Sequence, residues 1–412
     1  MNINFIWDKK VNRETFWALS AKSISAISGI ILLITIPLTW GIENYGYFSL
    51  ILAYITICSL LFGNSINSAL KKEFTEFTFS EFSKKYFIAG IKLKTSIFIL
   101  CSLIFYVFIF FSSLTLLKEN FFQFLVLLFL MNYGGLINNI FEATHNLYYV
   151  AISYTFEYLI KLTLVASFVI FDIRSLTALL NIFIIGYALS IIYGLVVLQS
   201  KLQIDLKHFL TPVDFHIYIA LFKRILLLSL SSASFVLLTR IDTILLSHFS
   251  SIENVGYYNI ASELTRNGSI IGVALVLGSV PLFVNGNRRI LFKNLIYKIF
   301  FINLLIFFGI IFFADFLIQI LYGSGYEKVS TLIKVLALYP LLLTLQNLIL
   351  EISLLKDKTH LIFVSGMFAV GINIFLSLIL IPIWGTYGAA ISTLISYLVW
   401  FTLNYLGVRK YI

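Results

Sequence analysis

The chain has 412 residues, of which 60% are hydrophobic and only 12% are charged, and its mean hydropathy is +0.98. Soluble domains carry about 25% charged residues, so this composition excludes an ordinary soluble protein and indicates a membrane protein with many spans. The formal net charge of +10 does not indicate a nucleic-acid partner, because the basic residues fall in alternate loops. Cys58 and Cys101 lie inside apolar runs, so neither a disulfide framework nor a metal cluster is expected.

Runs of about 20 apolar residues, long enough to cross the hydrocarbon core of a bilayer, recur along the chain. We expect twelve membrane-spanning helices, at 15–38, 46–70, 88–113, 121–143, 147–171, 176–199, 224–248, 256–284, 293–315, 330–355, 360–382 and 386–407. Six spans in each half predict two parallel lobes, residues 1–200 and 224–412, around a central cavity. An amphipathic linker on the cytoplasmic surface is expected at 201–223. The predicted fold is therefore an all-α membrane protein.

The distribution of lysine and arginine predicts the orientation of the spans. If the N-terminus is cytoplasmic, 21 of the 29 basic residues fall in inside segments, and three fall in outside loops. Cytoplasmic loops are enriched in basic residues. Both termini are therefore expected on the cytoplasmic side of the membrane.

A short motif occurs once in each half. GIENYGYFS runs from Gly41 to Ser49, SIENVGYYN runs from Ser251 to Asn259, and five of the nine positions are identical. Each copy lies in a short polar gap between two apolar runs, and Asn and Gly favour turns. The repeat predicts that the same helical hairpin opens both halves and that the chain arose by duplication.

Four charged residues fall on the predicted seventh and eighth spans: Arg240, Asp242, Glu263 and Arg266. These spans are antiparallel neighbours, so Arg240 and Glu263 are expected at similar depth, and Arg266 lies one turn from Glu263. Charged side chains within the bilayer need a partner or a watery cavity. The four residues therefore form either an ion-pair network that only fixes the hairpin, or a polar cavity wall where an arginine contacts an anionic substrate.

Four further charges lie within spans of the first half. Glu157 and Lys161 have the i,i+4 spacing of an ion pair, which is either a structural pair or part of a proton relay. Glu142, on the fourth span, is a second acid that could contribute to coupling. Lys22 lies about two turns into the first span, where it either extends to the cytoplasmic interface or points into the cavity.

Motifs for enzyme chemistry are absent from the sequence. It contains no G-x-x-x-x-G-K-[ST] motif, no H-E-x-x-H motif and no Ser/His/Asp arrangement. The outside loops are at most about a dozen residues long. We therefore expect a protein that is not an enzyme, with no catalytic residue, no metal and no cofactor.

Three stretches carry a family resemblance: the motif at 41–49, the run at 232–266 that contains Arg-Ile-Asp at 240–242, and the tail at 379–397 that contains Pro-x-x-Gly-x-x-Gly-Ala-Ala at 382–390. With the twelve-span frame, they resemble the polysaccharide flippases. These are the O-antigen transporter (Wzx-like) branch of the multidrug/oligosaccharidyl-lipid/polysaccharide exporter superfamily. The resemblance extends over nearly the whole chain.

The resemblance implies that an undecaprenyl-diphosphate-linked oligosaccharide moves from the inner to the outer leaflet by alternating access. It also implies that Lys22, Arg240 and Arg266 line the cavity. The implied partners are this lipid-linked glycan, membrane lipids and polysaccharide assembly proteins. The first span lacks the arginines of the lipid-linked peptidoglycan-precursor flippases, which disfavours that substrate. Two alternatives stay open: an ion-coupled multidrug exporter of the same superfamily, and a membrane glycan polymerase or ligase.

Overall fold

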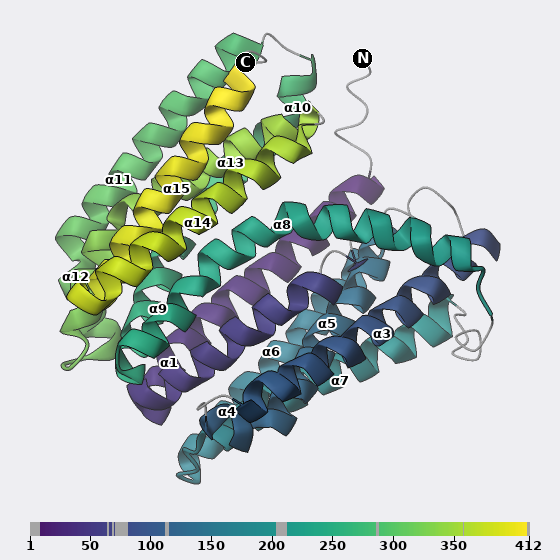
Figure 1. The fold of residues 1–412 in the computed structure, drawn as a ribbon, viewed down its shortest axis with the longest axis horizontal. Coiled ribbons are helices and arrows are strands. Elements are labelled where there is room, and N and C mark those ends of the chain that lie inside the picture. The colour runs from purple at the N-terminus through teal and green to yellow at the C-terminus, as the bar shows by residue number, and fades with distance from the viewer. Residues whose placement is uncertain are drawn as a thin grey trace. The chain divides into compact units, whose positions relative to one another are not determined.

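A computed structural model describes residues 9–63, 66–67, 70, 81–111, 115–202, 212–285, 288–356 and 358–409. The regular secondary structure of these residues is helical throughout (Figure 1). The predicted linker at 201–223 has its central part, 203–211, outside the described residues, so it stays a prediction.

Most of the helices are long enough to cross a membrane. In chain order they are α1 (Lys9–Phe62), α3 (Glu81–Phe111), α4 (Thr115–Glu119), α5 (Phe121–Ala143), α6 (Leu147–Ile170), α7 (Leu176–Leu202), α8 (Phe215–Phe249), α9 (Ile252–Asn267), α10 (Ile270–Asn285), α11 (Arg288–Tyr322), α12 (Glu327–Val335), the 3₁₀ helix η3 (Leu336–Leu338), α13 (Tyr339–Leu355), α14 (Thr359–Trp384) and α15 (Thr386–Val408).

Ten helical segments of the described chain are long and apolar enough to span a membrane. The first, Phe16–Leu60, covers two of the predicted spans, whereas α8, the predicted seventh span, is not among the ten. The all-helical membrane fold is thus confirmed, and the count of twelve spans stays a prediction.

The chain forms two compact units. Unit 1 comprises Met1–Thr39 and Ile55–Ser229, and unit 2 comprises Trp40–Tyr54 and Leu230–Ile412. In unit 1, α5, α6 and α7 pack against one another. Small residues allow close approach there: a Cβ added at Gly194 of α7 would lie 2.6 Å from the side chain of Ile137, and Ser153 and Ser190 join α6 to α7 by a hydrogen bond of 2.8 Å.

Unit 2 contains both copies of the repeated motif, and they pack against each other. A Cβ added at Gly46 would lie 2.2 Å from the carbonyl oxygen of Ile252, and one added at Gly256 would lie 2.6 Å from the carbonyl oxygen of Ile42. The contact is reciprocal, since Gly46 and Gly256 are equivalent positions of the repeat, as are Ile42 and Ile252. The shared glycines are therefore explained by the close approach of two backbones.

The turn of each hairpin lies at the first residue of the motif and not at the Asn and Gly that both copies share, which corrects the expectation from the sequence. The chain turns at Gly41, whose φ is 83°, and again at Ser250 and Ser251, between α8 and α9. The asparagines instead stabilise the start of the following helix. The side-chain amide of Asn44 donates to the carbonyl oxygen of Trp40, and that of Asn254 donates to Ser250 Oγ, each four residues back.

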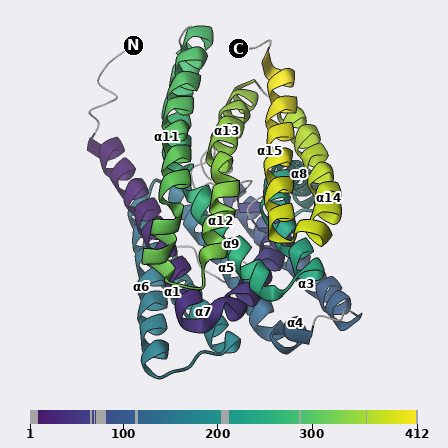
Figure 2. The same ribbon diagram turned by 90° about the vertical axis from the view of Figure 1, so that its left-hand side faces the viewer.

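The glycines of the 382–390 motif form the tight turn between α14 and α15, which lie side by side (Figures 1 and 2). Gly385 ends α14 with φ 54° and ψ −126°, a conformation that side chains resist. A Cβ added at Gly388 would lie 2.3 Å from the carbonyl oxygen of Leu380. This hairpin positions the polar residues of α14 and α15 that are described below.

Gly388→Ala should destabilise the protein. The added methyl group would collide with the backbone of Leu380, and overpacking of this kind costs about 1–3 kcal/mol. We expect a lower Tm for the detergent-solubilised protein, followed by intrinsic fluorescence. Gly371→Ala is the matched control, because a Cβ there meets no atom within 4 Å. A Tm that is equal in both variants would contradict the structure of this turn.

Candidate functional site

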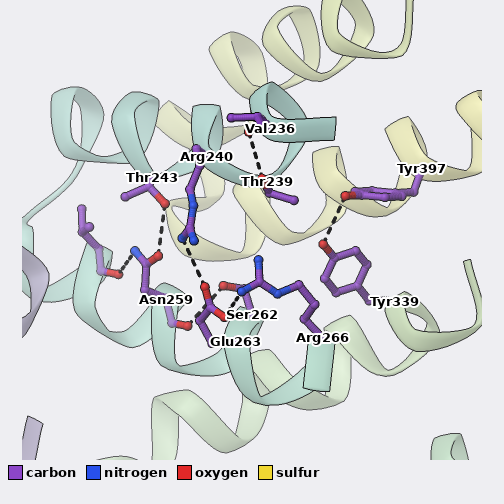
Figure 3. A network of polar contacts seen from close by, with 11 residues as sticks. Val236, Thr239, Arg240, Thr243, Asn259, Ser262, Glu263, Arg266, Tyr339 and Tyr397 are labelled. Carbon is purple, nitrogen blue, oxygen red and sulfur yellow. Dashed lines mark hydrogen bonds and ion pairs between the residues drawn. The ribbon is translucent and has the colours of Figure 1, made fainter. Parts of the chain in front are cut away.

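Two arginines share one carboxylate on α8 and α9 of unit 2 (Figure 3). Arg240 Nη1 lies 3.2 Å from Glu263 Oε1, and Arg266 Nη2 donates to Glu263 Oε2. The side chain of Arg240 is 20% exposed, that of Arg266 is 29% exposed and that of Glu263 is 22% exposed. The predicted ion pairs of Glu263 are thus present, and each of the three side chains is partly exposed.

Local structure sets the position of the cluster. Ser251 caps the N-terminus of α9, since its side chain accepts from the backbone N–H of Asn254. Closer to the cluster, Thr243 of α8 donates to Asn259 of α9 at 3.2 Å, and Asn259 donates in turn to the carbonyl oxygen of Val255. This contact fixes the register of the two helices, so that Arg240 faces Glu263.

The cluster has more hydrogen-bond donors than acceptors. Its charges are two guanidinium groups and one carboxylate, which leaves a net charge of +1. Arg240 Nε is buried and has no hydrogen-bond partner, although a guanidinium carries five N–H donors. Beside Arg266, the hydroxyl of Tyr339 donates to that of Tyr397 at 3.3 Å (Figure 3). The arrangement is chemically suited to an anion with several oxygen atoms.

Asp242 does not belong to this cluster, although the sequence predicted it there. Its side chain accepts hydrogen bonds from Tyr258 at 3.1 Å, Ser377 at 3.2 Å and Thr393 at 2.5 Å, and the residue is only 2% exposed. Asp242 lies two residues after Arg240, so the two side chains leave α8 on different faces. Its partners on α14 and α15 hold it inside unit 2.

The surroundings of Asp242 are built from oxygen atoms. In the part of the chain that the structure describes, no basic side chain forms an ion pair with it. The side-chain amide of Asn373 is buried beside Asp242. The described residues contain no group of three or more His, Cys, Asp or Glu side chains that could hold a metal ion. The carboxylate and hydroxyl oxygens at this site suit a proton or a hard monovalent cation more than a transition metal.

Glu157 and Lys161 form the predicted i,i+4 ion pair in unit 1. Lys161 Nζ lies 2.5 Å from Glu157 Oε1, and both side chains are buried. Aromatic rings surround the ammonium group: Lys161 Nζ lies 3.5 Å from the centroid of the Tyr187 ring and 4.8 Å from that of the Phe183 ring. Gly186 leaves room for the lysine, since a Cβ there would lie 2.7 Å from Lys161 Cγ. The charge of Glu157 is thus neutralised by Lys161, a cation on the same helix.

The other two predicted site residues both belong to unit 1. Lys22 is exposed on α1. Glu142 is half-buried in the last turn of α5. The proposed roles of both residues stay predictions.

Lys94 is a buried charged residue that the sequence reasoning missed. It is one of the 21 basic residues assigned above to inside segments, but it lies in α3 and is 0% exposed. Its Nζ donates to Asn67 Oδ1 at 2.7 Å and to the carbonyl oxygen of Asn132 at 2.8 Å. It falls inside the apolar run at 88–113, which was the signal that could have revealed it. The inside segment that precedes this run therefore contains one basic residue fewer than the sequence count assigned to it.

An apolar pocket of about 220 Å³ lies between α3, α5 and α7 of unit 1. Its walls include Phe87, Ile91, Phe129 and Tyr133. The walls offer few polar groups, so the pocket is better suited to a hydrocarbon chain than to a sugar.

Comparison with known proteins gives one family and one fold. A family model described as "Polysaccharide biosynthesis protein" matches residues 11–287. No curated protein matches the chain by sequence. The fold is similar to that of the lipid II flippase MurJ in an inward closed conformation, with a TM-score of 0.75 and 16% identity over 96% of this chain and 87% of that one.

Two multidrug transporters have the same fold. An inward-facing MATE family transporter of the MOP superfamily gives a TM-score of 0.73 at 14% identity, over 95% of this chain and 97% of that one. The MATE multidrug transporter DinF-BH gives 0.68 at 15% identity, over 98% and 96%. Identities this low show the fold alone. The similarity confirms the predicted all-helical membrane fold and leaves the substrate open.

Proposed function

The chain belongs to the polysaccharide biosynthesis protein family, and from this premise we propose that it is a flippase for an undecaprenyl-diphosphate-linked oligosaccharide. The cargo is an O-antigen unit or another surface polysaccharide repeat unit, moved from the inner to the outer leaflet. The protein is proposed to lie in a bacterial inner membrane with both termini in the cytoplasm. It acts as a transporter and not as an enzyme.

The observation that carries the proposal is the cluster of Arg240, Glu263 and Arg266. A diphosphate with attached sugars cannot cross hydrocarbon unaided, because charged groups are costly there. Two guanidinium groups supply the fork-shaped donors that bind phosphate oxygens, and their exposed fractions of 20% and 29% leave them accessible. The isoprenoid tail needs no such path, since it stays in lipid.

Alternating access is proposed as the mode of transport. Two lobes, residues 1–200 and 224–412, would open in turn to either side of the membrane, as parallel repeats of a transporter do. Such a cycle moves the polar head without a continuous pore.

Ion coupling has its own supporting observation, the buried carboxylate of Asp242. The carboxylate of Asp242 is buried and accepts three hydrogen bonds from hydroxyl groups, at 2.5–3.2 Å. It has no ion-pair partner among the described residues. A buried negative charge without a bound cation costs free energy. Binding a proton or a monovalent cation would remove that cost. We propose that Asp242 takes up the coupling ion, and that Glu157, already paired with Lys161, does not.

Deletion of the gene in its own cell tests the proposed function. We expect surface glycan to disappear and the lipid-linked oligosaccharide to accumulate in the inner leaflet, with both defects restored by the wild-type gene. Retention of a cationic dye is measured in the same strains. Normal surface glycan together with raised dye retention would instead support the multidrug exporter.

A further inference from the structure

The carboxylate of Glu263 occupies the place between two arginines that an anionic ligand would take. One of its oxygens accepts from Arg240, at 3.2 Å, and the other accepts from Arg266. Each guanidinium is thus bound to one oxygen atom of the same group (Figure 3). A ligand with two linked phosphates presents the same pattern, with more acceptor oxygens.

Glu263 leaves part of this donor set unused. Arg240 Nε is buried and unpartnered, which costs free energy for as long as no acceptor reaches it. The Glu263 side chain itself is 22% exposed, so it has space to leave the arginines. A diphosphate can offer acceptors to Arg240 Nε and to both guanidinium groups at once, whereas a single carboxylate cannot.

Without Glu263, the empty site would hold two neighbouring positive charges inside predicted membrane spans. Such charges are costly unless they are paired. The carboxylate lowers that cost when no substrate is bound, and for the same reason it competes with any anion that arrives.

We propose that Glu263 is an internal counter-anion: it occupies the arginine pair in the unloaded protein, and the diphosphate of the substrate displaces it. This inference rests on the proposed function and adds the exchange of one anion for another at the same two arginines. Return of the carboxylate to Arg240 and Arg266 then favours release of the substrate. Glu263 therefore weakens binding and makes it reversible.

The test is titration of the full-length protein in nanodiscs with inorganic pyrophosphate, followed by calorimetry. Glu263→Gln should bind pyrophosphate about tenfold or more tightly than the wild type, because the competing charge-assisted bonds are lost. Glu263→Asp, which keeps the charge and shortens the side chain, should fall between the two. Arg266→Gln should bind more weakly than the wild type.

Glu253→Gln is the matched control, since Glu253 lies on the same helix, is exposed and is outside the cluster. Its affinity should equal that of the wild type. Pyrophosphate affinity in Glu263→Gln and Glu263→Asp that is equal to or below the wild-type value would overturn the exchange and would make Glu263 a group that only positions the arginines. The proposed function is judged separately by glycan transport, so the two can fail independently.

Discussion

Surface glycan should fall by about tenfold or more in cells whose only copy of the protein carries Arg266→Gln or Arg240→Gln. Each change removes a guanidinium from the pair that flanks Glu263. A charge-assisted hydrogen bond contributes about 1.5–3 kcal/mol, and each 1.4 kcal/mol is about a tenfold change in an equilibrium constant. Surface glycan is measured by gel electrophoresis at matched levels of membrane-inserted protein.

Arg174→Gln serves as the control for loss of an arginine. Arg174 lies between α6 and α7, and its side chain is 54% exposed and pairs with Asp172 at 2.7 Å. Glycan in this strain should match the wild type. Normal glycan in both cluster variants, with normal amounts of protein, would exclude an essential role of the arginine pair in transport.

Asp242→Asn should abolish the dependence of transport on an ion gradient. The amide has nearly the shape of the carboxylate and can keep hydrogen bonds to Tyr258, Ser377 and Thr393, but it can neither gain a proton nor neutralise a cation. Transport driven by a sodium or proton gradient should therefore fall about tenfold or more. The measurement is glycolipid flipping in proteoliposomes with each gradient imposed in turn.

Asp315→Asn is the same chemical change at an exposed acid of unit 2. Asp315 pairs with Lys334 at 2.5 Å, and its side chain is 71% exposed. We expect gradient-driven transport to be unchanged in this control. If Asp242→Asn retained the full response to both gradients, the coupling ion would bind elsewhere.

The buried acids Glu157 of unit 1 and Asp242 of unit 2 have different partners. This difference is the reason why the coupling ion is proposed to bind at Asp242. In unit 1, the ammonium group of Lys161 lies 2.5 Å from Glu157, within a cage of aromatic rings. In unit 2, the hydroxyl groups of Tyr258, Ser377 and Thr393 donate to Asp242, and no basic side chain of the described residues pairs with it. A tethered cation is always present, so Glu157 has little to gain from an ion in solution, whereas Asp242 does.

Much of the fold could be predicted from sequence because apolar runs and a repeated motif are local signals. The repeat predicted equivalent segments, and the structure explains the identity of Gly46 and Gly256 by mutual backbone contact. The predicted position of the turns was wrong, because Asn44 and Asn254 stabilise the starts of helices instead of forming the turns. Turn chemistry and helix-capping chemistry use the same residue types.

The candidate site could be predicted where partners are close in sequence or lie on consecutive antiparallel helices, as Arg240 and Glu263 do. Glu263 and Arg266 are three residues apart, and Glu157 and Lys161 are four apart, so helical periodicity revealed both pairs. Asp242 accepts from residues 135 and 151 positions away. Only packing of α8 against α14 and α15 brings these together, and no local pattern encodes that packing.

The most direct test of the cationic site is flipping by the purified wild-type protein in proteoliposomes that contain one of two cargoes. Both carry the same oligosaccharide and the same isoprenoid tail, and only one has the diphosphate between them. We predict rapid flipping of the diphosphate-linked cargo and background flipping of the uncharged one. Equal rates for the two cargoes would contradict a mechanism in which Arg240 and Arg266 bind the diphosphate.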